Sequence, residues 1–322
     1  MFATGIAITA GYHRLYAHRS YKTRLGVEIV LLWFATMATQ GSVLRWTSDH
    51  RNHHIHVDSN KDPYSITKGF WYAHVLWIFH KPAPINKSLI HDLIKNKVLA
   101  FQDKYYELCL ITTNVLTTLA VGFITHSYLG AFIFCWLLRM FLVHHFTWLI
   151  NSLAHTWGER TYSKELSAVD NFVMALLTFG EGYHNYHHTF AHDYRNGIRW
   201  WHFDPTKWTI FTLQKARLAE SLKRVNHLTI KKKLVHADKN LLFEKLKNVV
   251  YIKRELLEAQ VHELSEKITN KLNLLQSSIE TYKKSKNKEI KKSIKELKLS
   301  LKQDWKNWYS LCDSILDLKP SL

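Results

Sequence analysis

Nine histidines of this 322-residue chain gather in four short motifs. Eighteen of the 21 histidines precede residue 203. The candidate metal ligands are His13 and His18 in the first motif, His50, His53 and His54 in the second, Asn151 and His155 in the third, and His184, His187 and His188 in the fourth. Because neutral imidazole is a common ligand for iron, zinc and copper, these motifs predict a metal centre.

Spacing within the motifs indicates how the side chains are presented. In the second and fourth motifs the histidines stand at i, i+3 and i+4, which places them on one face of a helix. Asn151 and His155 are likewise one turn apart. His13 and His18 diverge by about 140° on an ideal helix, so they reach two metals, or one metal if the helix loosens. Nine imidazoles exceed what one ion can hold, and with Asn151 they suit two metals with five and four protein ligands.

Apolar stretches of the sequence must position these motifs. Segments 105–124 and 128–150 have the length that crosses a hydrocarbon core of roughly 30 Å, and only Thr125–Ser127 separates them. We therefore expect a transmembrane hairpin. Lysines precede the hairpin and a basic tail follows it, which makes that side cytoplasmic by the positive-inside rule. Segment 1–12 has the pattern of the end of another spanning helix.

Segment 25–44 is also apolar enough to span, yet we expect that it does not cross the membrane. All four motifs must meet on one side of the membrane to share a metal centre. A crossing here would place His18 and His50 on opposite sides. We therefore predict that this segment is interfacial or re-entrant. The fold class predicted for the whole chain is an all-α integral membrane protein.

Charge divides the chain into a histidine-rich front and a lysine-rich tail. Residues 1–214 carry 19 basic and 13 acidic side chains, whereas residues 215–322 carry 25 and 13. We expect a membrane domain over 1–214, a linker over 215–237 and a helical tail over 238–322. Apolar residues of the tail recur every eleven positions, which predicts two nearly straight helices with a turn near SKNK. Such a helical hairpin lies on the membrane domain or the membrane surface, or serves self-association or partner docking.

Composition excludes several classes of function. Cys109, Cys135 and Cys312 form no CxxC pair, so we expect no disulfide framework, thiolate zinc site or ferredoxin-type cluster. The lysine-rich tail shows little aromatic interleaving and no recognised nucleic-acid-binding module, so we expect no nucleic-acid partner.

The motifs and their surroundings resemble the membrane-bound fatty acyl desaturases, specifically the stearoyl-CoA-desaturase-like (delta-9) family. The resemblance covers about residues 4–214. It includes GYHRLYAHRSY (11–21), RWTSDHRNHH (45–54), DPYSITKGFWYAHVLW (62–77), TWLINSLAHTWG (147–158), FGEGYHNYHHTFAHDYRNG (179–197) and DPTKW (204–208). The stretch QGSVLRW (40–46) is more similar to bacterial members than to animal ones.

The resemblance implies a cytoplasmic helical cap with a di-iron centre, in which the nine histidines are ligands and Asn151 holds one iron through a water. It implies that O₂ is a co-substrate and that a saturated acyl chain, on coenzyme A or in a lipid, receives a cis double bond at the delta-9 position. Electrons would come from an external ferredoxin or haem-type donor. The implied location is the bacterial inner membrane, with the active site on the cytoplasmic side. Ser48 stands where animal members have an arginine, which leaves acyl-lipid or carrier-protein substrates open.

Residues beside the motifs supply further candidates. Asp49, Glu181 and Asp193 could accept the second ring N–H of ligand histidines, although each could also be an ordinary surface charge. The candidate contacts for an anionic head group are Arg45, Lys68 and Lys81, and the candidate walls of an acyl tunnel are Trp46 and Trp148, together with Trp33, Phe34 and Phe146.

The chain begins within what resembles the second helix of the family's first hairpin, so we expect an N-terminally truncated form. Two other functions stay open on the sequence alone. One is a lipid hydroxylase of the same histidine-box superfamily, and the other is a non-catalytic membrane remnant.

Overall fold

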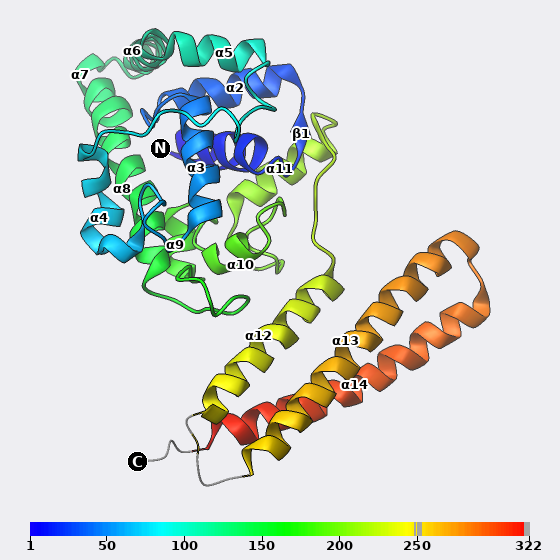
Figure 1. Cartoon of the computed structure of the whole chain (residues 1–322). Helices are drawn as coiled ribbons and strands as arrows, with labels where there is room; N and C mark the ends of the chain where they lie inside the picture. Colours follow the sequence, from blue (N-terminus) through cyan, green and yellow to red (C-terminus); the bar gives the residue numbers. More distant parts are fainter. Residues whose placement is uncertain (248, 250–252, 319–322) are drawn as a thin grey trace. The chain divides into compact units, whose positions relative to one another are not determined.

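The structure, a computed structural model, describes residues 1–247, 249 and 253–318 (Figure 1). Its regular elements, over these described residues, are helices and one pair of two-residue strands, joined by loops. The α-helices are α1 Phe2–Ile6, α2 Leu25–Thr36, α3 Val43–His56, α4 Phe70–His74, α5 Lys97–Lys104, α6 Tyr106–Thr125, α7 Tyr128–Ala131, α8 Arg139–Ser152, α9 Phe172–Leu177, α10 His184–Thr189, α11 Pro205–Lys215, α12 His227–Lys247, α13 Arg254–Ser285 and α14 Lys288–Leu316. Two π-helices, η1 Ala7–Ala17 and η4 Phe132–Leu138, and three 3₁₀ turns, η2 Ile66–Lys68, η3 Leu76–Phe79 and η5 Leu153–His155, complete the helical elements.

The chain forms two compact units. The first consists of Met1–Arg160 and Glu165–Arg224, and the second of Thr161–Lys164 and the chain from Val225 onward. In the first unit, strand β1 Lys22–Thr23 pairs antiparallel with β2 Ala219–Glu220, so the segment after the first histidine motif is tied to the end of the unit.

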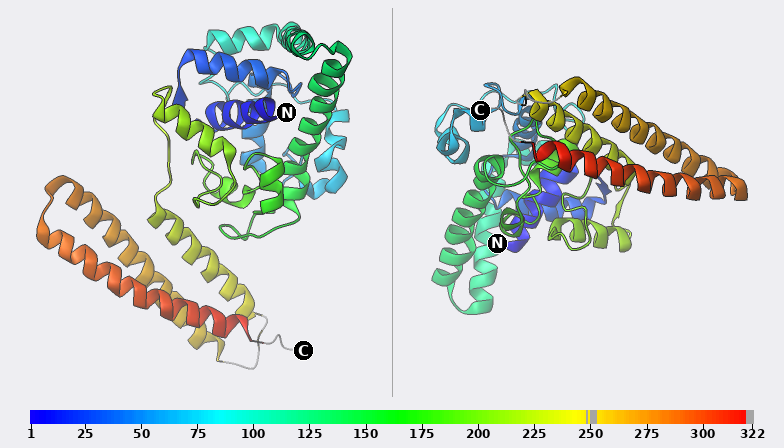
Figure 2. Two further views of the ribbon diagram at one scale, coloured as in Figure 1. Left: turned by 180° about the vertical axis from the view of Figure 1, so that it is seen from behind. Right: turned by 90° about the horizontal axis from the view of Figure 1, so that it is seen from below.

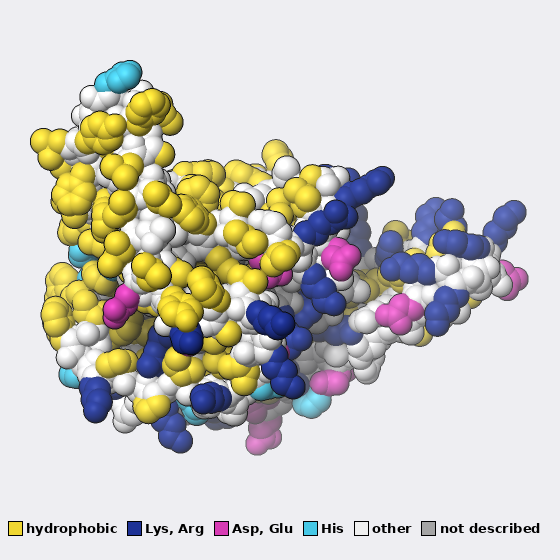
Figure 3. All heavy atoms as spheres, turned by 90° about the horizontal axis from the view of Figure 1, so that it is seen from above, with side chains coloured by type: hydrophobic (Ala, Val, Ile, Leu, Met, Phe, Trp, Pro, Cys, Tyr) yellow, Lys and Arg dark blue, Asp and Glu magenta, His cyan; other side chains and the backbone are white. Residues whose placement is uncertain are grey.

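Two helical segments of the first unit are long and apolar enough to cross a membrane. They are Tyr106–Thr125, with 20 residues, and Tyr128–His155, with 28 residues. A short turn joins the two, and α6 packs against α7 and η4 close to it, as the right view of Figure 2 shows. Hydrophobic side chains cover this hairpin where it projects at the upper left of Figure 3. Only 22% and 17% of their most apolar windows are buried, so these side chains face outward, as lipid contact requires. The second segment extends past the predicted end at 150 because η5 continues it to His155.

Helix α2 is too short to cross a membrane by itself. Its 12 residues rise about 18 Å, against a hydrocarbon core of roughly 30 Å. The chain then turns and enters α3, and Nε2 of His18 lies 2.8 Å from Nε2 of His50. The first two histidine motifs therefore lie on the same side of any bilayer that α6 and α8 cross.

The hydrophobic core of the first unit lies where η1, α2 and α3 pack together. Tyr12 and Leu15 of η1 belong to it, as do Leu31 of α2 and Val43 of α3. Gly11 permits the close approach of η1 and α2, since a Cβ at this position would lie 3.3 Å from Cβ of Leu31. This packing sets the relative position of the first two histidine motifs.

The second unit is a bundle of α12, α13 and α14 around its own apolar core. Helix α12 begins at His227, inside the stretch 215–237 that we expected as a linker, and Ser221–Asn226 connects it to β2. Apolar residues recur every seven positions at Leu228, Val235 and Leu242 and pack against α13 and α14. The lysine run within this stretch hid that period, and the tail accordingly has three helices instead of two. The turn between α13 and α14 lies at Lys286–Asn287.

Candidate metal centre

The π-helix η1 brings the two histidines of the first motif to one place. The amide N of His18 donates to the carbonyl O of His13 over 3.0 Å, five residues back. Residues five apart thus lie one turn apart, whereas on an α-helix they would diverge. Of the two possibilities left open by the spacing, the structure has the loosened helix, and both side chains belong to one group of ligands.

All nine histidines gather in two groups whose sizes are five and four. Within each group the nearest ring nitrogens lie within 4.8 Å of one another. The first group is His13, His18, His50, His54 and His187, and the second is His53, His155, His184 and His188. Two metals with five and four histidine ligands are therefore compatible with this geometry. Helix α10, which is six residues long, contributes to both groups.

Distances inside the groups fit a metal ion between the rings. Nitrogen ligands about 2.0–2.1 Å from one ion lie about 3 Å from each other. Nε2 of His187 lies 3.1 Å from Nε2 of His13 and 3.0 Å from Nε2 of His54. In the second group, Nε2 of His184 lies 3.1 Å from Nε2 of both His155 and His188.

The protonation state of the rings also suits metal binding. Burial, followed by the charge of the neighbouring histidines, holds the pKa of six histidines of the two groups well below the usual value: His18, His50, His54, His184, His187 and His188. Neutral rings keep the Nε2 lone pair available for a metal ion.

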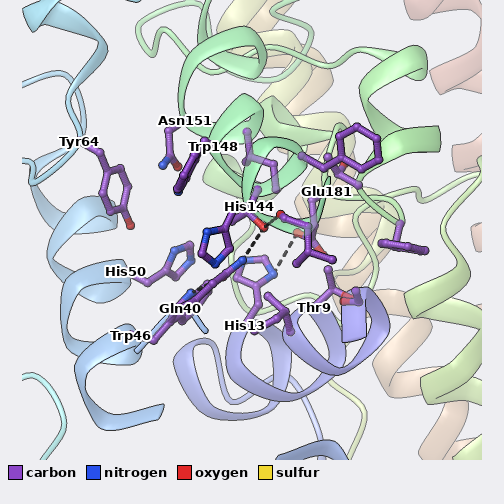
Figure 4. Close-up of a pocket in the computed structure, with 18 of the residues that line it drawn as sticks. Thr9, His13, Gln40, Trp46, His50, Tyr64, His144, Trp148, Asn151 and Glu181 are labelled. Carbon is purple, nitrogen blue, oxygen red and sulfur yellow. Dashed lines mark hydrogen bonds and ion pairs between the residues drawn. The ribbon is translucent and has the colours of Figure 1, made fainter. Parts of the chain in front are cut away.

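Carboxylates stand behind two of the ligand rings. Nδ1 of His13 lies 2.9 Å from Oε2 of Glu181, and Nδ1 of His53 forms a hydrogen bond of 2.9 Å with Oδ2 of Asp62. Such partners fix which ring nitrogen faces the metal. Figure 4 shows His13 and Glu181 on the wall of a cavity. Glu181 thus lies beside a histidine ring of the first group.

Glu181 is itself held by a buried network. Nε and Nη2 of Arg14 donate to its Oε1 over 3.2 and 2.9 Å, and Nδ2 of Asn196 donates to its Oε2 over 2.7 Å. Burial alone would raise the pKa of Glu181, but His13 and Arg14 outweigh burial and lower it. Arg14 also pairs with Asp204, whose carboxylate caps α11, so the ligand ring is connected to the helix that follows the fourth motif.

The other two predicted carboxylates lie elsewhere. Asp49 faces the cavity. Its Oδ1 lies 3.6 Å from Nη1 of Arg45, which stands one turn earlier on the same side of α3. Asp193 accepts hydrogen bonds from Tyr186 and pairs with Arg195 at 2.7 Å. The role of these two aspartates behind ligand rings stays a prediction.

Sequence reasoning missed three residues behind the ligands. Asp62 opens the DPYSITKGFWYAHVLW segment, which was a usable signal. Nδ1 of His155 forms a hydrogen bond of 2.6 Å with Ser167, whose hydroxyl donates to Asp58. Ser167 and Asp58 lie outside every recognised motif, so the sequence offered no signal for them.

A cavity of about 370 Å³ opens onto both histidine groups. His13 and His50 of the first group and His53 and His184 of the second line it. The cavity is within the range of small-molecule sites, about 300–1,000 Å³. Asn151 also faces it and belongs to neither histidine group (Figure 4).

Aromatic residues on α3 and α8 form much of the cavity wall. Trp46 and Trp148, both predicted for the tunnel, line it, as does Phe146. Trp33 and Phe34 of α2 are not among the described residues that line it, and Phe34 packs against the hydrophobic core.

The three candidate head-group residues stand outside the cavity lining. Arg45 donates to the carbonyl of Ala83, so it lies beside the segment that carries Lys81, which is exposed. Lys68 lies 4.8 Å from the ring centre of Tyr72. Ser48 is buried and accepts a hydrogen bond from the amide of Asn86 over 3.0 Å, so its hydroxyl holds this segment in place.

Comparison with known proteins identifies the family. Residues 1–220 match the model of the fatty acid desaturase family. The chain belongs to that family. Its relatives include a probable acyl-CoA desaturase of Schizosaccharomyces pombe, 39% identical over 74% of this chain and 50% of that protein, and acyl-CoA desaturase 1 of Saccharomyces cerevisiae, 37% identical over 75% and 48%.

Relatives of this desaturase family member also include a cyanobacterial protein. The sn-1 stearoyl-lipid 9-desaturase of Anabaena variabilis is 37% identical over 68% of this chain and 79% of its own length. The chain spans about half the length of the two yeast relatives. The relatives' names thus cover both acyl-CoA and acyl-lipid desaturases.

Proposed function

We propose that the chain is an oxygen-dependent fatty acyl desaturase that introduces a cis double bond at the delta-9 position of a saturated acyl-CoA. The observation that carries this proposal is the apolar cavity onto which histidines of both groups open. The family match and the relatives named delta-9 or acyl-CoA desaturases support it.

The residues fit the di-iron centre that the family implies. Nine imidazoles in groups of five and four, with Glu181 and Asp62 behind two rings, match the needs of two divalent ions. Two iron ions bound there would supply the oxygen activation that removing hydrogen from an unactivated methylene requires. Asn151 faces the same cavity and would approach one ion through a water.

The chain's own residues hold the substrate. Trp46, Phe146 and Trp148 exclude water from the cavity and restrict an acyl chain to a path beside the histidines. Arg45, positioned by Asp49 and the carbonyl of Ala83, offers a positive charge for an anionic head group outside the cavity lining, and Lys68 and Lys81 are further cations on exposed segments.

The two candidate spans support a membrane location for this activity. We place the histidine centre on the cytoplasmic side of a bacterial inner membrane, because the basic segments flank the hairpin on the same side as the motifs. Electrons come from an external ferredoxin or haem-type protein, and the formal net charge of +18 favours its docking if the donor is acidic.

Product analysis tests the proposal. The full chain, purified with iron and supplied with a reduced donor and O₂, should convert stearoyl-CoA to a monounsaturated product two hydrogens lighter, as measured by mass spectrometry. A product with an added oxygen would establish a hydroxylase instead. Conversion of stearoyl-lipid but not stearoyl-CoA would contradict the head-group assignment alone.

His187→Ala provides the matching loss of function. It removes one ligand of the first group and leaves the apolar spans intact, so we expect membrane insertion without activity and less bound iron. His91→Ala, at an exposed position, is the control and should retain both activity and iron. Full activity of the His187 variant would contradict the metal assignment, and well under one iron in the unaltered chain would favour a non-catalytic remnant.

A further inference from the structure

Lysines of the second unit form a single stripe along α14. Counting from Lys288, they stand at i, i+3, i+4, i+7, i+10, i+14 and i+18, which spans only about 120° of the helix surface at 100° per residue. The seven are Lys288, Lys291, Lys292, Lys295, Lys298, Lys302 and Lys306, and all are exposed. Over these residues the stripe is about 27 Å long.

The stripe is separate from the buried side of the same helix, with its centre about 120° away at 100° per residue. Ile294, Leu301 and Trp308 face the core of the bundle. Glu289 and Glu296 fall to one side of the stripe. The carboxylate of Asp304 forms ion pairs with Lys267, at 3.2 Å, and Lys271 of α13. Within the described part of the chain, the structure has no ion pair to any of the seven lysines. Their positive charge is therefore not compensated by the bundle itself.

Charge is segregated along the bundle as well. From 283 to 298, where α13 ends and α14 begins, the sequence has eight lysines and two glutamates. From 254 to 282 it has three basic and five acidic residues. Lys232, near the start of α12, donates to Gln276, so the end of α13 and the start of α14 extend past α12 as a two-helix arm (Figure 1). The most basic part of the unit is thus its projecting part.

We propose that the lysine stripe of α14 binds the anionic surface of the membrane in which the chain is anchored. Two candidate spans keep a bilayer within reach, and the six residues Ser221–Asn226 that lead into the bundle extend to about 20 Å at most. Polybasic segments near a membrane are attracted by the negative surface potential of anionic lipids.

The face itself favours lipid over a protein partner. Leu299 and Tyr309 are 73% and 58% exposed and stand within the stripe, where they would enter the head-group layer among the lysines. Lysine is a compact point charge without the fork that reads a defined carboxylate, so the stripe suits a surface of many equivalent anions.

Lysine acetylation tests this on the intact chain. The protein is placed in nanodiscs of zwitterionic phosphatidylcholine alone or with 30% phosphatidylglycerol, and acetylation by a neutral reagent is followed site by site by mass spectrometry. We expect the stripe lysines to react at least three-fold more slowly in the anionic nanodiscs. Lys247, exposed on α12 and paired with Glu244, is the internal control and should change little. At 1 M salt, where the Debye length is about 3 Å, the difference should disappear.

A charge variant and its matched control complete the test. K291Q/K295Q/K298Q should lose most of the protection of Lys302 and Lys306, whereas K245Q/K247Q/K283Q, with the same loss of charge, should keep it. Glutamine and lysine have similar helix propensity, so circular dichroism should show unchanged helix content in both. Equal acetylation rates in both nanodiscs at low salt would overturn the proposal. Protection that appears only when an acidic carrier protein is added would overturn it in favour of protein docking.

Discussion

At the residue scale, Glu181 is the carboxylate that links a histidine of the candidate metal centre to the buried network behind it. One carboxylate faces the ring of His13, the guanidinium of Arg14 and the amide of Asn196. Asp49, of the same chemical type, lines the same cavity and faces Arg45. Comparing variants of Glu181 and Asp49 therefore distinguishes the effect of a carboxylate behind a histidine ring from that of a carboxylate on the cavity wall.

We predict that Glu181→Gln loses iron and Asp49→Asn does not. The first change removes the charge that orients the His13 ring, and loss of such a partner lowers metal affinity about 10–100-fold. Iron per chain after dialysis against a chelator measures the difference. Because Glu181→Gln also leaves buried Arg14 with only one carboxylate partner, the melting temperature should fall too. Equal iron retention in the two variants would remove Glu181 from its assigned role.

Asp170 gives stability a pH dependence. Burial, with a smaller contribution from Glu159, raises the pKa of this carboxyl from 3.8 to about 7 in the folded chain. The unfolded chain ionises first as pH rises, so the contribution of Asp170 to stability is full below about pH 4 and is lost as pH rises through 7. We expect the melting temperature of the chain to fall more steeply between pH 5 and 8 than that of Asp170→Asn. Parallel curves would show that this carboxyl does not titrate there.

At the element scale, α2 decides on which side the first two motifs lie. We expect cysteines placed at Lys22, before α2, and at Lys61, after α3, to react with an impermeant maleimide from the same side of the membrane. A cysteine at His126, in the turn of the α6–α8 hairpin, should react from the other side. All three positions are exposed. Labelling of Lys22→Cys and Lys61→Cys from opposite sides would mean that α2 helps to cross the bilayer.

Elements and ligands differed in how far the sequence could predict them. Spacing within the four motifs singled out the nine histidines that the structure gathers, and for six of them the i, i+3 and i+4 positions share a face whatever the tertiary contacts. The π-helix η1 was one of two options, since only packing against α2 and α3 selects its looser turn. Ser167 was out of reach because a loop residue's partner depends on tertiary structure. In α12, the charge of three consecutive lysines masked a regular apolar period.

At the scale of the whole molecule, net charge governs how a donor protein arrives. The formal net charge is +18, so the chain should attract an acidic electron carrier over distance. We predict that turnover at limiting donor falls as salt rises, because the Debye length shrinks from about 10 Å at 0.1 M to about 3 Å at 1 M. Turnover at saturating donor should change little.

Removing residues 225–322 tests whether the tail or the first unit attracts the electron donor. If the tail lies on lipid, as we propose, the salt dependence of the truncated chain should match that of the full chain. A weaker salt dependence after truncation would assign the tail to donor recruitment. A rate at limiting donor that does not respond to salt would exclude electrostatic docking of the donor altogether.

The division of α10 between the two histidine groups has a consequence for the order of synthesis. His187 completes the first group, and His184 and His188 complete the second, so both groups remain incomplete until the ribosome has passed residue 188. By then both candidate spans, which end at His155, have already been made. A nascent chain that stops between residues 155 and 188 therefore carries both candidate spans but lacks a complete histidine group of either kind.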